Sequence, residues 1–527
     1  MVGKGPTAPA LEKKAESFNP TTDDAEEPTT HATYKKPKLS RTRSIVLALV
    51  LGSSPFLTLS MTQACVIILP SIGRDLKIHP GNLQWVLSAA SVANACSLPL
   101  WGRLADIWGR RFIFQFGLAS FCISCLIAPF APNEVSFCFF RVLHGLGGAA
   151  AVPSAVSIIF EVFPPGKPQI NAMSVFSAGF PLGSLIGNIL GGLIAQQVNW
   201  HWVFWIMSIA TACSWVASLF VVPFLAKDAE IREVSFQKRL YYLWIEMDWV
   251  GLLLCLAILL LFLVSLTAGN VVGWKSPWVL TLLFASCLIL PVFIKWEYWL
   301  EKTAKRPPLI KLSIFRSPIY RGAQIIDAIF WAAFNNFLVF ASYFYQDYQG
   351  LDVLQTTLRF LPSGIAGIVA TLISSQVLSR VDGYYMVLWC TACISVACLL
   401  FAVPIPPDTT YWAYGFPSMV LLTLGGDMLF PCISIFVMNS IPEKDRAAGA
   451  AIFQTLGQVG RSVGLAVATA IQIAMTDDKS EQNGNYRPHS ESMLRGLRAA
   501  EWFNFAISVT AFVVAAYSFR GAGKVNK

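Results

Sequence analysis

The sequence contains little charge and few of the residues on which enzyme chemistry depends. Asp, Glu, Lys and Arg make up 13% of the 527 residues, whereas soluble domains contain about 25%. Apolar residues make up 55%, and the mean hydropathy is +0.57. Only five histidines occur, and there is no zinc-binding helix motif and no phosphate-binding loop with its Lys. These absences exclude a soluble protein and argue against an enzyme or an ATP-driven pump.

Cysteine is present, but not where it could form extracellular disulfides. All twelve cysteines fall inside apolar stretches, where a thiol is most often a small buried hydrophobic group. We expect no cleavable signal peptide, because the first residues are polar. Residues 1–43 are rich in Pro, Thr, Glu and Lys, so we expect a disordered cytoplasmic tail there.

The sequence does contain a series of long apolar stretches. A bilayer core about 30 Å thick needs roughly 20 helical residues. Fourteen stretches approach this length, so the sequence predicts an all-α polytopic membrane protein with fourteen transmembrane helices. The expected spans are 44–70, 82–102, 112–131, 135–160, 169–197, 200–224, 247–268, 277–296, 320–346, 354–379, 384–402, 411–440, 446–475 and 499–519.

The distribution of Lys and Arg predicts which loops face the cytoplasm. With the N-terminus inside, twenty-one of these residues beyond the tail fall in cytoplasmic loops and the C-terminus, and seven fall in exterior loops. Short loops rich in Lys and Arg stay on the cytoplasmic side. We therefore expect both termini to be cytoplasmic, with the plasma membrane as the expected location. The net charge of +9 then belongs to these loops rather than to a surface for nucleic acid.

Two long loops divide the predicted spans into groups of six, two and six. The first separates the sixth span from the seventh, and the second separates the eighth from the ninth. The predicted organisation is a tail (1–43), an N-terminal six-helix bundle (44–224), linkers with two inserted central helices (225–319), a C-terminal six-helix bundle (320–519) and a cytoplasmic C-terminus (520–527).

A charged stretch between the second and third spans is the clearest motif. It reads Gly-Arg-Leu-Ala-Asp-Ile-Trp-Gly-Arg-Arg and predicts a tight cytoplasmic turn. Because the Asp just precedes the third span, we expect the positive end of that helix to stabilise its carboxylate. The stretch is similar to the signature loop of the major facilitator superfamily (MFS), Gly-x-Leu-Ala-Asp-x-x-Gly-Arg-Arg. The resemblance implies an MFS fold and a conformational latch that closes the cytoplasmic side, formed by Gly102, Asp106, Gly109, Arg110 and Arg111.

The arrangement of six, two and six spans resembles the fourteen-span drug:proton antiporter branch of this family, the fungal-type multidrug and aminotriazole-resistance-like transporters. That branch implies export of small molecules by alternating access. It also implies that the proton gradient is the driving force and that no cofactor or metal is needed. The expected partners are the lipid bilayer, protons and a small-molecule substrate, with no nucleic acid and with the monomer as the working unit.

An arginine inside the fourth span predicts a coupling site. A guanidinium at membrane depth costs about 2.5–3.5 kcal/mol, so it needs a partner or a wet cavity. Arg141 and the residues after it resemble the family motif Arg-x-x-Gln-Gly-x-Gly-Ala-Ala, with His144 at the Gln position. In the family this arginine is associated with proton coupling. The alternatives are a packing role for Arg141 and a hydrogen-bonded core role for His144.

Glycines in the fifth span follow a helical spacing. Gly183, Gly187 and Gly191 are placed to form a flat groove against another helix. With Asn188 and Gly192 they resemble the antiporter signature Gly-x8-Gly-x3-Gly-Pro-x2-Gly-Gly, which implies export. Asn188 replaces the Pro, and a Ser replaces the first Gly. The alternative of an uptake porter or facilitator for a small inorganic or nitrogenous solute therefore stays open.

Acidic residues in the second bundle are the candidate proton carriers. Asp427 lies in mid-span, whereas Asp327 lies about two turns from the cytoplasmic end and could pair with Arg321. We expect Asp427 to titrate and to face Arg141 across a central cavity, with a hydrogen-bonding role for Asp427 as the alternative. Arg461 is a candidate second interdomain cation, with packing as the alternative. The spans that correspond to cavity-lining helices of the family carry the predicted substrate contacts Gln63, His144, Asn335 and Asn336.

Overall fold

Long apolar helices make up the described part of the chain. The computed structural model describes residues 40–78, 83–224, 247–304, 308–351, 353–378, 380–403, 409–476 and 489–520. Fourteen long helices occur in these ranges, and each overlaps one predicted span. They are α1 (Arg41–Asp75), α2 (Leu83–Trp108), α3 (Arg110–Ile127), α4 (Glu134–Val162), α5 (Lys167–Gln197), α6 (Trp200–Val221), α9 (Trp249–Val272), α10 (Pro277–Trp299), α11 (Pro318–Tyr343), α12 (Val353–Leu378), α13 (Gly383–Ala402), α14 (Tyr411–Asn439), α15 (Arg446–Met475) and α17 (Glu491–Ser518).

Twelve of these helices are long and apolar enough to cross a membrane, which agrees with a multi-pass all-α membrane protein. The two that fall short are α2 and α15. Both contain charged residues, such as Arg103 and Asp106 in α2 and Arg461 in α15. The two helices pack against each other, so part of their polar surface faces protein rather than lipid. Hydropathy therefore supports twelve spans and leaves the predicted number of fourteen open.

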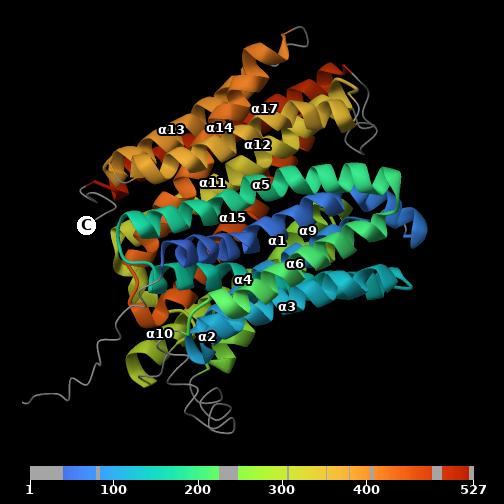
Figure 1. The fold of residues 1–527 in the computed structure, drawn as a ribbon. Helices are drawn as coiled ribbons and strands as arrows, with labels where there is room; N and C mark the ends of the chain where they lie inside the picture. Colours follow the sequence, from blue (N-terminus) through green and yellow to red (C-terminus); the bar gives the residue numbers. More distant parts are fainter. Residues whose placement is uncertain are drawn as a thin grey trace, which may run out of the picture. The chain divides into compact units, whose positions relative to one another are not determined.

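The helices pack as two bundles with an additional pair (Figure 1). The first bundle contains α1 to α6, in which α1 lies along α5 and α4 lies against α2 and α3. The second contains α11 to α17, in which α11 lies against α15 and α17. One seam between the bundles is formed by α2 with α15, and the other by α5 with α12. The pair α9–α10 packs on the first seam, where α9 contacts both α2 and α15.

The predicted ten-residue turn is almost entirely helical. α2 continues through Trp108, six residues beyond the predicted end, and α3 begins at Arg110. Gly109 alone connects them, with a φ of 98° that a residue with a Cβ rarely adopts. Because one glycine makes the turn, the charged residues of the motif are held on rigid helix ends. The predicted tail up to residue 39, the loop 225–246 and the C-terminal residues 521–527 lie outside the described residues.

Candidate functional site

Residues of the charged motif join the two bundles. Gly102 lies against α15, and a Cβ added there would come within 2.4 Å of the Ala451 Cβ. The Asp106 carboxylate accepts hydrogen bonds from the backbone N–H groups of Ala447 at 3.2 Å and Ala448 at 2.9 Å. These N–H groups belong to the first turn of α15, where no intrahelical acceptor exists. The helix end that stabilises this carboxylate is thus that of α15, not that of α3 as we predicted.

Arg110 extends this contact. It forms ion pairs with Asp106 at 3.3 Å and with Glu161 of α4 at 2.8 Å, and it also donates to the Glu443 carbonyl at the end of the second bundle. Arg111 instead donates to the Leu219 carbonyl of α6 at 2.8 Å. Of the two adjacent arginines, Arg110 therefore reaches across the seam, and this bond of Arg111 stays within the first bundle.

A further acid, which the sequence did not single out, lies beside this contact. Asp445 precedes α15 and is 5% exposed. It lies 3.9 Å from Arg103 of α2 and 2.6 Å from the Lys311 ammonium group. Lys311 belongs to the segment that follows the inserted pair, so one carboxylate connects three parts of the chain. The paired charges at positions 443–446 were the available signal in the sequence.

Arg141 and His144 are buried inside the first bundle. Arg141 is 1% exposed, and its Nε donates to the Val86 carbonyl of α2 at 3.3 Å. His144 is 4% exposed, lies 3.5 Å from the Cys125 thiol and packs on Phe121 of α3. Neither lines the large cavity found in the described residues. The proton-coupling role of Arg141 and the substrate contact of His144 stay predictions.

Asp327 and Arg461 come together in the second bundle. Asp327 is 1% exposed and lies against α15, where a Cβ added to Gly457, one turn before Arg461, would come within 2.7 Å of its Oδ2. The two charged groups are close enough to attract each other but form no direct ion pair within the described residues. The Arg461 guanidinium lies 4.7 Å from the ring centre of Trp331. Within the described residues no ion pair joins Asp327 to Arg321, and residues six apart lie on different faces of a helix. Trp331 also touches Phe180 of α5, at 6.1 Å between ring centres, so these two charged residues lie next to a contact between the bundles.

Asp427 lies at the other seam. A Cβ added to Gly367 of α12 would come within 2.4 Å of the Asp427 Oδ2 and 2.7 Å of the Pro181 Cβ of α5. Oδ2 is buried and accepts no hydrogen bond in the described structure. Within the described residues, no hydrogen bond or ion pair joins Asp427 to Arg141. The structure thus places Asp327 near Arg461 without a direct ion pair, and it shows no contact between Asp427 and Arg141 within the described residues.

The predicted amide contacts lie in different surroundings. Gln63 donates to Ser184 of α5 at 3.2 Å, and Asn335 is half-buried. Asn336 is fully buried and donates to Asn504 of α17 at 3.0 Å. Asn504 in turn donates to Glu501, a buried acid that was not among the residues predicted from the sequence. Its position inside a predicted span was the signal that could have identified it.

The fifth-span glycines lie against α1. A Cβ on Gly183 or Gly187 would come within 2.5 or 2.3 Å of the Phe56 or Ser60 carbonyl oxygen. A Cβ on Gly191 would lie nearly as close to α1, whereas a Cβ on Gly192 would meet no atom within 4 Å. The half-buried Asn188 follows Gly187. Three of the four glycines therefore allow the two helix backbones to approach each other.

We expect Gly187→Val to destabilise the protein, because the new side chain must push α5 away from α1. Overpacking of this kind costs about 1–3 kcal/mol. Thermal unfolding of the purified protein in detergent should show a clearly lower melting temperature. Gly192→Val is the matched control, since the same change there meets open space. Equal melting temperatures for the two variants would contradict the assigned contact.

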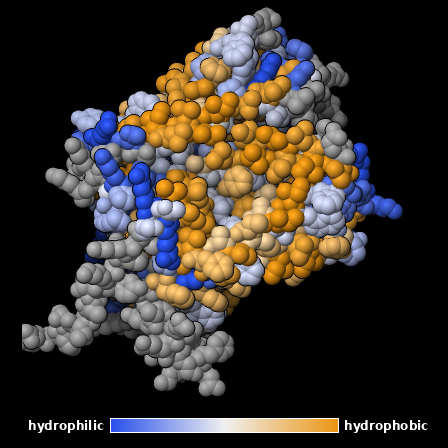
Figure 2. Space-filling model, viewed as in Figure 1, coloured by the Kyte–Doolittle hydropathy of each residue, from blue (hydrophilic) through white to orange (hydrophobic). Residues whose placement is uncertain are grey.

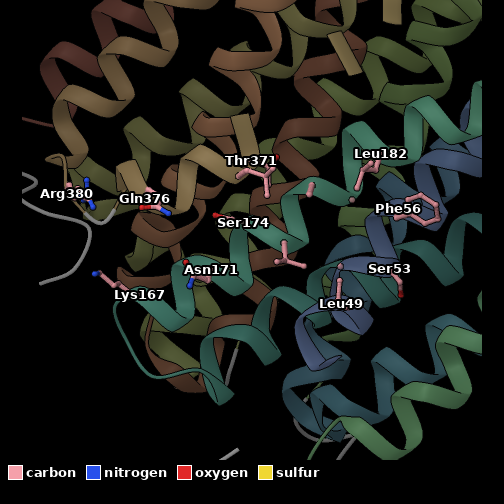
Figure 3. A pocket seen from close by; sticks show the side chains of 15 residues that line it. Leu49, Ser53, Phe56, Lys167, Asn171, Ser174, Leu182, Thr371, Gln376 and Arg380 are labelled. Atoms are coloured by element: carbon pink, nitrogen blue, oxygen red, sulfur yellow. The ribbon is translucent and has the colours of Figure 1, made fainter. Parts of the chain in front are cut away.

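The described structure also contains a cavity of about 690 Å³ (Figure 3). Its walls come from α1, α5 and α12, and Ser174 of α5 is hydrogen-bonded to Ser374 of α12 at 3.0 Å beside it. None of the four predicted substrate contacts lines this cavity.

Comparison with known proteins gives the family. The family model described as Major Facilitator Superfamily matches residues 51–465. The low affinity ammonium transporter of Saccharomyces cerevisiae is 28% identical, with 85% of this chain and 83% of that protein covered. Efflux pump terJ of Aspergillus terreus is also 28% identical, over 85% and 82%. The structure of the human organic anion transporter MFSD10 covers 90% of this chain and 100% of its own, with a TM-score of 0.62 at 13% identity. This family and fold are those of transporters, not enzymes, and the chain belongs to the major facilitator superfamily.

Proposed function

We propose that this protein is a proton-coupled exporter of small molecules with fourteen transmembrane helices. It works as a monomer in the plasma membrane, with both termini in the cytoplasm, and uses the proton gradient without a cofactor. The similarity to efflux pump terJ and the close packing of α5 on α1 support export. The mutual packing of α2 and α15 supports fourteen spans, because helices that face protein can carry charge within a membrane.

The main support for alternating access is the capping of α15 by Asp106. This carboxylate comes from one bundle, and the N–H groups that it binds come from the other. The end of the protein that carries the motif can open only if these hydrogen bonds and the Gly102 contact are broken. The Asp106–Arg110–Glu161 network holds the carboxylate in position and would act as the latch of the closed state.

Two carboxyl groups that each have a buried oxygen atom support proton coupling. Asp327 lies beside Arg461, and the same helix that carries Arg461 also carries the N–H groups bound by Asp106. A proton on Asp327 would remove its attraction for Arg461 and leave α15 free to move. Asp427 lies at the seam of α5 and α12, where its charge has no described counter-ion. A buried charge without a partner is costly in a membrane, so a proton there would favour the closed seam.

Asp427→Asn tests the proton-carrying role. In sealed vesicles with a defined pH gradient, we expect the parent to accumulate ethidium only in an acidic lumen and to lose it after addition of a proton ionophore. The variant should lose at least about 90% of the gradient-driven part, because an amide cannot take up the proton. Full pH dependence in the variant would remove Asp427 from the mechanism, and a parent that is indifferent to the gradient would refute antiport.

An uptake porter or facilitator for a small nitrogenous solute is the second candidate. The specific observation in its favour is the similarity to the yeast low affinity ammonium transporter over 85% of the chain. The same vesicles distinguish the two functions when radiolabelled methylammonium replaces ethidium. Methylammonium flux without a proton gradient, together with no ethidium transport, would favour this candidate.

A further inference from the structure

The seam between α5 and α12 is open along one side. α1 and α12 both pack on α5, and the cavity of about 690 Å³ lies in the gap between them. We call this cavity the α5–α12 groove. Leu49 on the α1 side is 58% exposed, and Leu372 on the α12 side is 70% exposed. The other seam is different, because α9 packs on both α2 and α15. The groove is therefore accessible from the surroundings of the protein.

The groove changes in character along its length (Figure 3). Lys167 and Arg380 lie at one end, near Asn171. Phe56 and Leu182 lie toward the other end. The charged end coincides with the first turn of α5 and the residues just after α12. Figure 2 shows that the middle of this face is mainly apolar, with hydrophilic residues toward its ends. The α5–α12 groove thus has a cationic end formed by Lys167 and Arg380, which we call the mouth. We call the apolar remainder of the groove the trough.

The charge of the groove has one sign. Its fifteen lining residues include Lys167 and Arg380 but no acid. Neither cation forms an ion pair within the described residues. Two cations beside an apolar trough match a molecule with an anionic head and an apolar tail. A free anion would use only the mouth, and a neutral lipid would leave the cations without a partner.

We propose that the α5–α12 groove binds an anionic phospholipid from the surrounding bilayer. The phosphate lies between Lys167 and Arg380, and an acyl chain lies along Leu49, Phe56 and Leu182. The bilayer is the source because the exposed rims face the apolar belt of the protein (Figure 2). The lipid would touch α1 and α5 of one bundle and α12 of the other, so it would bridge the seam from outside.

Native mass spectrometry of the full-length protein tests this site with phosphatidylglycerol and phosphatidylcholine of identical chains. We expect the parent to retain the anionic lipid with the higher affinity. The double variant K167Q/R380Q should weaken that binding about thirtyfold, since each cation near a membrane surface contributes roughly fivefold. R316Q/R321Q is the matched control, because it removes two exposed cations outside the groove lining. Inorganic phosphate should not displace the lipid.

Ala178→Trp tests the trough separately, because it fills the groove and keeps both cations. We expect it to reduce retention of the anionic lipid while the melting temperature stays near that of the parent. Equal affinity for the two lipids would overturn the proposal. An equal loss of affinity for the anionic lipid in K167Q/R380Q and in its control would also overturn it, because it would indicate nonspecific attraction. Displacement by inorganic phosphate would assign the mouth to a free anion instead.

Discussion

Gly102→Val should reduce transport at least about tenfold. The added side chain would meet the Ala451 Cβ at 2.4 Å and the Ala447 carbonyl oxygen at 2.9 Å. Because one of these atoms is backbone and the other is the first side-chain atom of a packed helix, α2 and α15 must separate. Overpacking costs about 1–3 kcal/mol, and this cost applies only to the state in which the seam is closed. Two states of similar free energy would then shift toward the open one.

The accompanying measurement is the labelling of a cysteine introduced at Ala105, which is 1% exposed at this seam. Its reaction with a water-soluble maleimide should be faster in the Gly102→Val background, relative to the same proteins without the added cysteine. Gly192→Val provides the control for loss of a helical glycine, because a Cβ added at Gly192 would meet no atom within 4 Å. Parental transport together with unchanged labelling would show that the Gly102 contact is dispensable.

The fold could be predicted from the sequence because the apolar stretches encode it directly. Each predicted span overlaps one helix, and the family expected from the Gly102–Arg111 motif is the one whose model matches the chain. The ends of the helices were harder to predict. α2 runs six residues past its expected end because Arg103 and Asp106 are satisfied by the second bundle rather than by water. Hydropathy along the sequence does not include contacts with residues of other helices.

The site was predictable by residue type but not by pairing. The sequence identified Asp106, Asp327 and Arg461 as charges in unusual places. It could not show that the partner of Asp106 is the start of a helix more than 300 residues away, or that Arg461 rather than Arg321 lies beside Asp327. These pairings depend on the rotation of α11 and α15 about their axes. That rotation is set by packing across the whole bundle, so the sequence of a single helix does not reveal it.

The electrostatic attraction between Asp327 of α11 and Arg461 of α15 should make Asp327→Asn destabilising. The change removes the negative charge that attracts the half-buried Arg461 guanidinium. Because the two groups form no direct ion pair within the described residues, we expect a cost below the about 3–5 kcal/mol that is typical of breaking a buried ion pair. We expect a lower melting temperature in detergent and a smaller folded fraction after purification. The packing of Arg461 on Trp331, at 4.7 Å, remains and cannot replace a full negative charge.

Two further variants separate this pair from a general effect of removing a carboxylate. Asp427→Asn makes the same chemical change at a carboxyl group whose Oδ2 has no described partner, so it should not lower stability. The double variant Asp327→Asn/Arg461→Gln removes both charges, and it should recover most of the stability that Asp327→Asn loses, since no unpaired charge remains. If the two single carboxylate variants were equally destabilised, or if the double variant were worse than Asp327→Asn, then Arg461 would not depend on Asp327. Proton-coupled transport should stay impaired in both Asp327 variants, because restoring stability does not restore the proton-binding group at position 327, and Asp427 alone would carry the coupling.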